Sequence, residues 1–188
     1  MKEAKLGQRV VFFVDTAHFI LAPYLGMLWC FVRQFVRAPA RRQRFNVLGA
    51  LNAITHELIL VTNDAYINAD SVCELLRLIA ARGFSIPITL ILDNARYQKC
   101  HLVTELAKTL GIELLYLPTY SPNLNIIERL WKFVKKDCLN SIYYKDFTLF
   151  KSAISTCLAQ TQTKHKAALD SLLALNFQTF KKSRILAR

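Results

Sequence analysis

Two aspartates stand directly after runs of apolar residues, which is a costly place for a carboxylate. Residues 10–14 have the pattern of a buried strand that leads into Asp15, and residues 86–92 form a second apolar run that leads into Asp93. Buried carboxylates lose hydration, and two of them at neighbouring strand ends repel each other unless a cation lies between them. Hard divalent ions such as Mg²⁺ or Mn²⁺ prefer oxygen ligands. The pattern therefore predicts a site for a pair of these ions.

A third acid, Glu128, lies in a segment with helical periodicity over residues 124–138, after a loop that contains two prolines. Helical projection places Glu128 beside Asn125 and Lys132. It lies away from an apolar stripe formed by Ile127, Trp131 and Val134. Glu128 can therefore point from a packed helix toward the strand ends, whereas Trp131 is interpreted as a core residue.

Each acid also has an ordinary structural interpretation. Asp15 could be a turn residue, Asp93 a helix cap and Glu128 a solvated helix residue. Taken one at a time, these interpretations are as well supported as metal binding. Only the combination of the three acids with their flanking segments favours the metal site.

The elements that would position the acids follow from the spacing of apolar residues. After the first strand, residues 45–54 and 58–62 have strand character with a turn between them, which predicts an antiparallel meander. The apolar segment 19–32 is interpreted as buried core, and residues 24–36 as a strand pair that leads into a basic segment. Residue Pro23 and the length of this segment argue against a membrane span.

A helix is predicted over residues 68–82, because apolar residues recur on one helical face there. Asp70 or Ser71 could cap the start of this helix, and Gly83 marks its end. The helix would follow the meander directly.

A β-α-β unit is predicted next, with a parallel pair of strands. Its strands are residues 86–92 and 112–117, and its helix covers residues 102–110. Two further helices are predicted over residues 147–160 and 166–180. The unit would place Asp93 at the carboxyl end of its first strand.

The segments around the acids carry a resemblance to a known family. Residues 91–95 have the sequence ILDNA, and residues 116–131 have the sequence YLPTYSPNLNIIERLW. Together they closely resemble the second and third catalytic blocks of DDE-type transposases of the mariner superfamily and of related bacterial insertion sequences. The 34 residues between Asp93 and Glu128 match a separation characteristic of that superfamily. The segment VFFVD at residues 11–15 is a weaker match, but it stands where the family's first aspartate is expected.

This resemblance covers residues 10–146 and implies an α/β fold of the ribonuclease H-like type, a mixed sheet flanked by helices. It implies that a DNA phosphodiester is hydrolysed to leave a 3′-hydroxyl, which then attacks target DNA. Two Mg²⁺ or Mn²⁺ ions would be held by Asp15, Asp93 and Glu128, with Asp93 bridging both. Six residues are predicted to contact DNA, namely Asn94, Tyr120, Ser121, Lys132, Lys135 and Lys136. Each of the six also has an ordinary packing, turn or solvated interpretation.

The sequence departs from the family pattern in two places. Many relatives have an acidic residue where this chain has Thr16, and many have proline where it has Ile126. Glu128 as the third acid resembles the bacterial insertion-sequence branch more than the mariner branch itself. Neither departure removes a predicted metal ligand.

The formal net charge of +12 is unevenly distributed. From residue 129 onward there are 12 lysines or arginines against three aspartates, and five arginines lie within residues 33–44. This asymmetry favours a polyanionic partner, for which nucleic acid and an acidic membrane surface are the candidates and solubility alone is the plain alternative. The resemblance implies double-stranded DNA as that partner. A nuclease without strand transfer and an inactive DNA-binding relic are the competing functions.

Cysteine and histidine residues show no ligand pattern in the sequence. The five cysteines are widely spaced without a Cys-x-x-Cys pair, which predicts reduced and mostly buried thiols. The four histidines are scattered singly, so none is favoured for a direct chemical role. No signal-peptide pattern is found near the start, and we expect a cytoplasmic protein that is associated with the nucleoid if bacterial.

We expect residues 1–146 to form the catalytic domain and residues 147–188 to be a basic helical extension of the same domain. The resemblance implies that an intact transposase of this kind carries a tandem of helix-turn-helix modules joined to its catalytic domain. Only 14 residues precede Asp15 here. This predicts a truncated copy, one part of a fused protein, or the second product of a split or frameshifted reading frame with a separately encoded helix-turn-helix partner. A homodimer is a further expectation.

Overall fold

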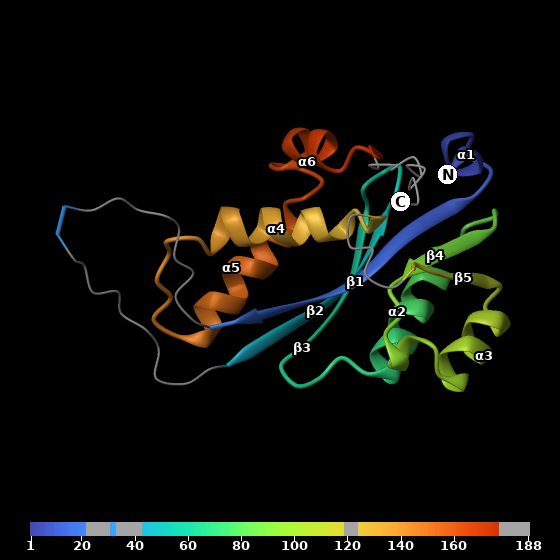
Figure 1. Cartoon of the computed structure of the whole chain (residues 1–188), viewed down its shortest axis with the longest axis horizontal. Coiled ribbons are helices and arrows are strands. Elements are labelled where there is room, and N and C mark those ends of the chain that lie inside the picture. The colour runs from blue at the N-terminus through green and yellow to red at the C-terminus, as the bar shows by residue number, and fades with distance from the viewer. Residues whose placement is uncertain (22–30, 33–42, 119–123, 177–188) are drawn as a thin grey trace, which may run out of the picture.

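A mixed five-stranded sheet forms the centre of the molecule in the computed structural model, which describes residues 1–21, 31–32, 43–118 and 124–176 (Figure 1). The strand order is β3-β2-β1-β4-β5. The strands are β1 (Val10–Ile20), β2 (Arg44–Asn52), β3 (Leu58–Asn63), β4 (Ile88–Leu92) and β5 (Ile112–Tyr116). The three strands β1, β2 and β3 form an antiparallel meander, and β1, β4 and β5 run parallel. The predicted meander and parallel pair are both confirmed.

The first strand is longer than the sequence predicts, because β2 pairs with it far beyond Asp15. Pairing between β1 and β2 runs from Phe12 opposite Asn52 to Ile20 opposite Arg44. Pairing between β1 and β4 runs only from Val10 opposite Ile88 to Phe13 opposite Ile91. Asp15 therefore lies in the middle of β1, close to the point where the parallel partner ends.

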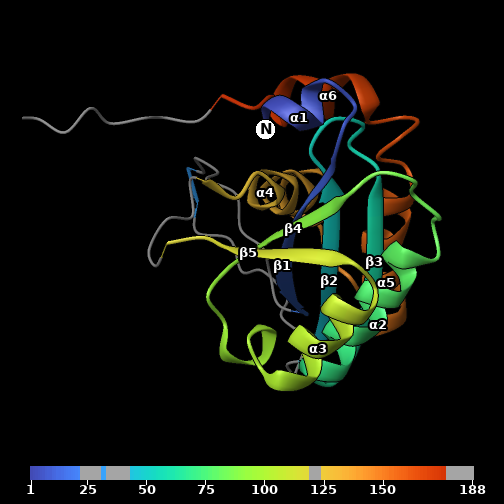
Figure 2. The ribbon, with the colours of Figure 1, turned by 90° about the vertical axis from the view of Figure 1, so that its right-hand side faces the viewer.

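Helices cover both faces of the sheet and create two separate cores (Figures 1 and 2). On one face lie α2 (Ala69–Ala80), η1 (Arg96–Gln98) and α3 (His101–Thr109). On the other lie α4 (Ile127–Cys138), α5 (Phe147–Ala159) and α6 (Lys166–Leu172). A short helix, α1 (Lys2–Lys5), precedes β1. Figure 2 shows α4 on the opposite side of the strands from α2 and α3.

Alternation along β1 decides which face receives Asp15. Phe12 and Val14 are buried in the core with α2 and α3, whereas Phe13 and Ala17 are buried in the core with α4 and α5. Because successive side chains of a strand point to opposite faces, Asp15 lies on the same face as Phe13 and Ala17. The aspartate is therefore directed toward α4.

Helix ends differ from the predictions in two places. The cap of α2 is Asn68, not Asp70 or Ser71. The Asn68 side chain accepts a hydrogen bond from the backbone N–H of Ser71, and the Ser71 side chain accepts one from the backbone N–H of Asn68, which forms a capping box. Gly83 follows this helix with a φ of 66°, which supports its predicted role as a stop. The last helix, α6, ends at Leu172 and is shorter than predicted, and residues 177–180 lie outside the described part of the chain.

The apolar segment 19–32 is only partly buried where it is described. Phe19 and Leu21 belong to the core, but Phe31 and Val32 are exposed, so the prediction of a continuous buried segment is wrong at its end. Most of the strand pair predicted for residues 24–36 lies outside the described residues. Among the described residues there is no helix with the length and apolar character that crossing a bilayer requires.

Gly49 of β2 provides the space into which α4 packs. It pairs with Asp15, and a Cβ atom at this position would lie 2.8 Å from Cη2 of Trp131 and 3.1 Å from Cδ1 of Ile127. We expect Gly49→Ala to lower the free energy of unfolding by about 1–3 kcal/mol, because the helix must shift away from the sheet. Urea denaturation measures this cost.

Trp131→Phe provides the control for Gly49→Ala, since the smaller ring lacks the atoms that clash. In the double variant, Gly49→Ala should cost clearly less than it does alone. Equal costs in both backgrounds would show that contact with Trp131 is not the reason for the glycine.

Candidate active site

Strand register brings Asp15 and Asp93 to the same edge of the sheet. Phe13 pairs with Ile91 in the last parallel pair of β1 and β4, and the same register continued by two residues places Asp15 opposite Asp93. Asp93 follows β4 directly and is exposed, whereas Asp15 is partly buried within β1. The two acids, far apart in sequence, are therefore neighbours across two parallel strands.

Helix α4 is fixed to β1 by two hydrogen bonds on either side of Glu128. The Nδ2 atom of Asn125 donates to the carbonyl oxygen of Val14 at 3.2 Å, and Nε1 of Trp131 donates to Oδ2 of Asp15 at 3.0 Å. Asn125 and Trp131 are both buried. Because Glu128 lies between these anchors on the first turn of α4, its carboxylate is held next to Asp15.

The electrostatics of Asp15 show that the three carboxylates act on one another. Burial raises the pKa of Asp15 to about 7, and the negative charges of Asp93 and Glu128 raise it as well. Hydrogen bonds from the Thr16 backbone and the Trp131 indole act in the opposite direction. Burial also raises the pKa of Glu128, with a further contribution from Asp93. Without a cation, this arrangement holds negative charge at an energetic cost.

An open pocket of about 340 Å³ lies against two of the three acids. Its lining includes Asp15, Glu128 and Trp131, together with Lys132 and Lys135 from the next turns of α4. Lys132 also acts on Glu128, because its positive charge lowers the pKa of that carboxyl. The pocket therefore combines oxygen ligands suited to hard cations with ammonium groups suited to phosphate.

The other residues predicted to contact DNA have different outcomes. The Nδ2 atom of Asn94 donates to the carbonyl oxygen of Leu117 and so ties the ends of β4 and β5 together. Lys136 is exposed on α4 but does not line the pocket. Tyr120 and Ser121 lie outside the described residues. Contact of these side chains with DNA stays a prediction.

Three residues near the acids were not predicted to contribute to the site. Trp131 is buried as predicted, but its indole N–H also binds Asp15, and Asn125 anchors the start of α4. The hydroxyl of Tyr97 lies 3.3 Å from Oγ1 of Thr16. Burial raises the pKa of this hydroxyl, and the negative charges of Asp93 and Asp15 raise it further. A signal existed for Trp131, since a buried indole N–H requires an acceptor. No sequence pattern pairs Tyr97 with Thr16.

Solved structures with the same architecture define the class of fold. A Mos1 transposase paired-end complex with the left transposon end has a TM-score of 0.57 at 14% identity, covering 89% of this chain and 56% of that chain. The Mos1 mariner paired-end complex with Mn gives 0.58 at 13% identity, with the same coverages of 89% and 56%. The catalytic core domain of BIV integrase gives 0.52 at 15% identity, covering 86% and 94%. The fold is that of ribonuclease H-like transposase and integrase catalytic cores, as predicted.

The sequence itself places the chain in one family. A profile of the DDE superfamily endonuclease family matches residues 10–151, and the chain belongs to that family. It is 30% identical over 129 residues to the insertion element IS630 uncharacterized 39 kDa protein of Shigella sonnei, covering 67% of this chain and 38% of that protein. It is 36% identical over 58 residues to an uncharacterized protein of Sinorhizobium fredii, covering 31% and 41%. The chain thus spans about two fifths of the length of these relatives.

The contact between Trp131 and Asp15 leads to a prediction. Trp131→Phe keeps a ring in the core but removes the only group of this side chain that can donate to the carboxylate. Hydrogen bonds to charged groups contribute about 1.5–3 kcal/mol, so we expect the metal-dependent DNA cleavage proposed below to fall by about 10- to 100-fold at neutral pH. The pKa of Asp15 should rise further, which moves the pH profile of activity to higher pH.

Phe19→Leu is the control, because the Phe19 ring packs edge-on against Trp131 with centroids 6.4 Å apart. This change should lower the melting temperature without moving the pH profile. If Trp131→Phe left the pH profile in place as well, Trp131 would be a packing residue only.

Proposed function

We propose that this chain is the catalytic domain of an insertion-sequence transposase, which cleaves DNA and transfers the cleaved strand with divalent metal ions. In this proposal residues 1–146 form the catalytic domain and residues 147–188 extend it. The observation that carries the proposal is the meeting of Asp15, Asp93 and Glu128 at one edge of the sheet, beside a pocket lined by two lysines.

The residues present fit a pair of divalent ions. All three acids are oxygen donors, and the pKa of Asp15, raised chiefly by burial, shows a carboxylate that lacks a compensating positive charge. We propose that Asp93 is shared between two Mg²⁺ or Mn²⁺ ions, since its charge acts on both other acids, with Asp15 and Glu128 completing the two sites. When bound, such ions would activate the attacking oxygen, stabilise the leaving oxygen and neutralise the phosphate.

The remaining side chains of the site would orient these acids and the DNA. Trp131 fixes one oxygen of Asp15, and Asn125 holds the start of α4 against β1. Lys132 and Lys135 would attract the phosphate backbone without reading its sequence. The proposed partner is therefore double-stranded DNA, while a homodimer and a separately encoded helix-turn-helix partner stay predictions.

A strand-transfer assay tests this function. The protein is incubated with Mn²⁺ or Mg²⁺ and a labelled duplex that carries the inverted repeats flanking its reading frame, together with a target plasmid. We expect 3′-hydroxyl ends and their covalent joining to the plasmid. Cleavage without joining would show a nuclease, and the absence of both reactions together with the absence of metal binding would overturn the proposal.

A further inference from the structure

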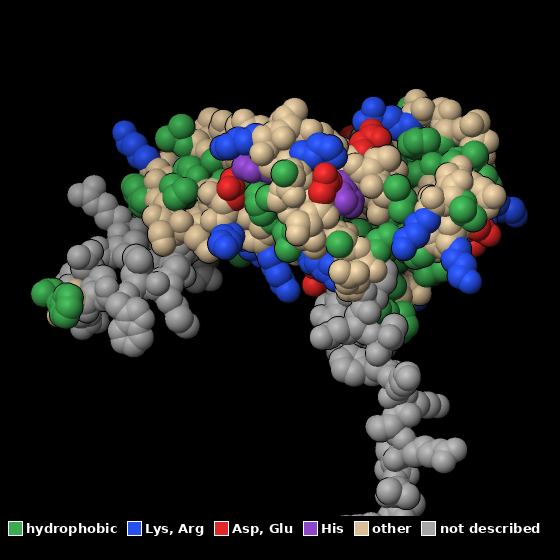
Figure 3. Space-filling model, turned by 90° about the horizontal axis from the view of Figure 1, so that it is seen from above, with side chains coloured by type: hydrophobic (Ala, Val, Ile, Leu, Met, Phe, Trp, Pro, Cys, Tyr) green, Lys and Arg blue, Asp and Glu red, His purple; other side chains and the backbone are tan. Residues whose placement is uncertain are grey.

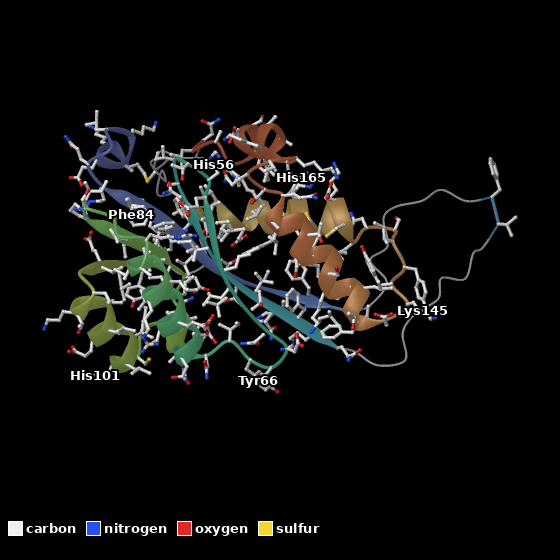
Figure 4. The ribbon with its side chains drawn as sticks, turned by 180° about the vertical axis from the view of Figure 1, so that it is seen from behind. His56, Tyr66, Phe84, His101, Lys145 and His165 are labelled. Carbon is white, nitrogen blue, oxygen red and sulfur yellow. The ribbon has the colours of Figure 1, made fainter. Side chains whose placement is uncertain are left out.

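A second group of potential ligands lies away from the three carboxylates, where helices α4, α5 and α6 meet. Asp137 comes from α4, Cys157 from α5, and His165 is the residue before α6. Their ligating atoms all lie within 4.8 Å of one another. Figure 4 shows His165 at this junction. Seen from above in Figure 3, histidine side chains lie beside acidic ones at separate places on that face.

The two separations that involve Asp137 agree with those between ligands of one tetrahedral metal ion. Oδ2 of Asp137 lies 3.6 Å from Nε2 of His165 and 3.6 Å from Sγ of Cys157. Metal–ligand distances of about 2.0–2.1 Å for nitrogen and oxygen and about 2.3 Å for sulfur imply ligand separations of about 3.3–3.6 Å in a tetrahedral site. Small movements of these side chains would therefore complete the geometry.

Packing fixes two of the three ligands and leaves access to the third. Cys157 and His165 are buried, and the His165 ring makes an edge contact with Phe133 at 5.2 Å between centroids. The backbone N–H of His165 donates to the carbonyl oxygen of Gln160, which holds the turn between α5 and α6. The Asp137 side chain is 37% exposed, so an ion can reach the cluster from solvent and keep a water ligand.

We propose that Asp137, Cys157 and His165 bind one zinc-class transition-metal ion at a site separate from the three carboxylates. Thiolate and imidazole ligands select borderline-soft ions such as Zn²⁺ and disfavour Mg²⁺, whereas Asp15, Asp93 and Glu128 offer oxygen alone. Binding deprotonates the Cys157 thiol, and its proton passes to water.

A metal at this junction would link three helices that are otherwise joined by packing. Its ligand Asp137 is near the end of α4, and the beginning of α4 carries Glu128. The ion would therefore stiffen the helix that positions one of the active-site acids. The pKa of the Cys157 thiol is raised by its contact with Cys138 and by burial, which means that metal binding competes with a proton at this sulfur.

Cobalt substitution tests the proposal, because Co²⁺ bound by a thiolate has an intense near-ultraviolet charge-transfer band that oxygen ligands do not produce. The full chain is stripped of metal, kept in a non-thiol reductant and titrated with CoCl₂. We expect a saturable band with one thiolate-bound ion per chain, which Zn²⁺ displaces. Zn²⁺ should also raise the melting temperature by several degrees.

Two variants and two controls identify the ligands. Cys157→Ser should abolish the band, and Asp137→Asn, at an exposed position where folding is retained, should weaken Co²⁺ affinity at least tenfold. Cys73→Ser, on the opposite face of the sheet, and Asp93→Asn, in the active site, should leave the band unchanged. A wild-type protein without the band, or a band that persists in folded Cys157→Ser, would overturn the site without affecting the proposed transposase function.

Discussion

Asp93→Asn should reduce metal-dependent DNA cleavage by about 10³-fold, the largest effect that we expect from a single substitution in this chain. Asp93 lies opposite Asp15 when the register of β1 and β4 is continued by two residues, and its charge acts on both Asp15 and Glu128. It is therefore the acid best placed to coordinate two ions. An amide in its place keeps the size of the side chain but loses the negative charge that holds a divalent ion. Cleavage of labelled duplex in Mn²⁺ over a range of concentrations measures the loss.

Asp64→Asn is the matched control, since Asp64 is an exposed aspartate whose partner is Lys151 at 2.7 Å. We expect it to cleave DNA at the wild-type rate. Calorimetric titration with Mn²⁺ separates loss of binding from loss of the chemical step. Wild-type cleavage and wild-type Mn²⁺ binding in folded Asp93→Asn would exclude the proposed metal site.

The order of the elements could be predicted because local patterns specify it. A β-α-β unit is indicated by three local patterns: an apolar run before Asp93, a helical face after it and a strand that ends at Tyr116. The structure has β4, α3 and β5 in that order. The turn before β3 was also predictable, and His56 there has a φ of 57°. In these segments local propensity and tertiary structure agree.

Features that depend on partners distant in sequence could not be predicted. The extension of β1 past Asp15 requires β2, whose pairing continues to Ile20 opposite Arg44. The start of α2 at Asn68 depends on which of several capping residues adopts an extended backbone. A short apolar run such as Phe31 and Val32 carries no information on what would cover it, and both side chains are exposed.

The candidate sites show the same limit. Three acids and their flanking motifs were visible in the sequence, but their proximity depends on the register of β1 with β4 and on the two hydrogen bonds of α4. His165 has no ligand at a recognisable spacing in the sequence. Its neighbours Asp137 and Cys157 come from different helices, and only their packing brings the three together.

Asp15→Asn should stabilise the metal-free protein at alkaline pH, although it weakens the site for divalent ions. The pKa of Asp15 is about 7 in the folded chain against an ordinary value of 3.8, so the folded state binds the proton more tightly than the unfolded state. The stability that the neutral carboxyl of Asp15 contributes to the folded state is fully present below about pH 4, and it is lost as the pH rises to about 7. The shift corresponds to a loss of up to about 4 kcal/mol at pH 8.

Asparagine keeps an oxygen that can accept the hydrogen bond from Trp131 but never becomes charged. Urea denaturation in EDTA should therefore show that Asp15→Asn exceeds the wild type in free energy of unfolding at pH 8, and that the difference becomes small near pH 4. Comparing the two proteins at each pH cancels the titration of groups they share.

Added Mn²⁺ at pH 8 should reverse this order, because the ions stabilise a folded state with a charged Asp15 and have a weaker site in the variant. Thermal unfolding with and without Mn²⁺ measures the reversal. An Asp15→Asn protein that is less stable than the wild type at pH 8 in EDTA would mean that the buried carboxylate is already compensated by the protein itself. In that case the charge of Asp15 would give no reason for a cation at this edge of the sheet.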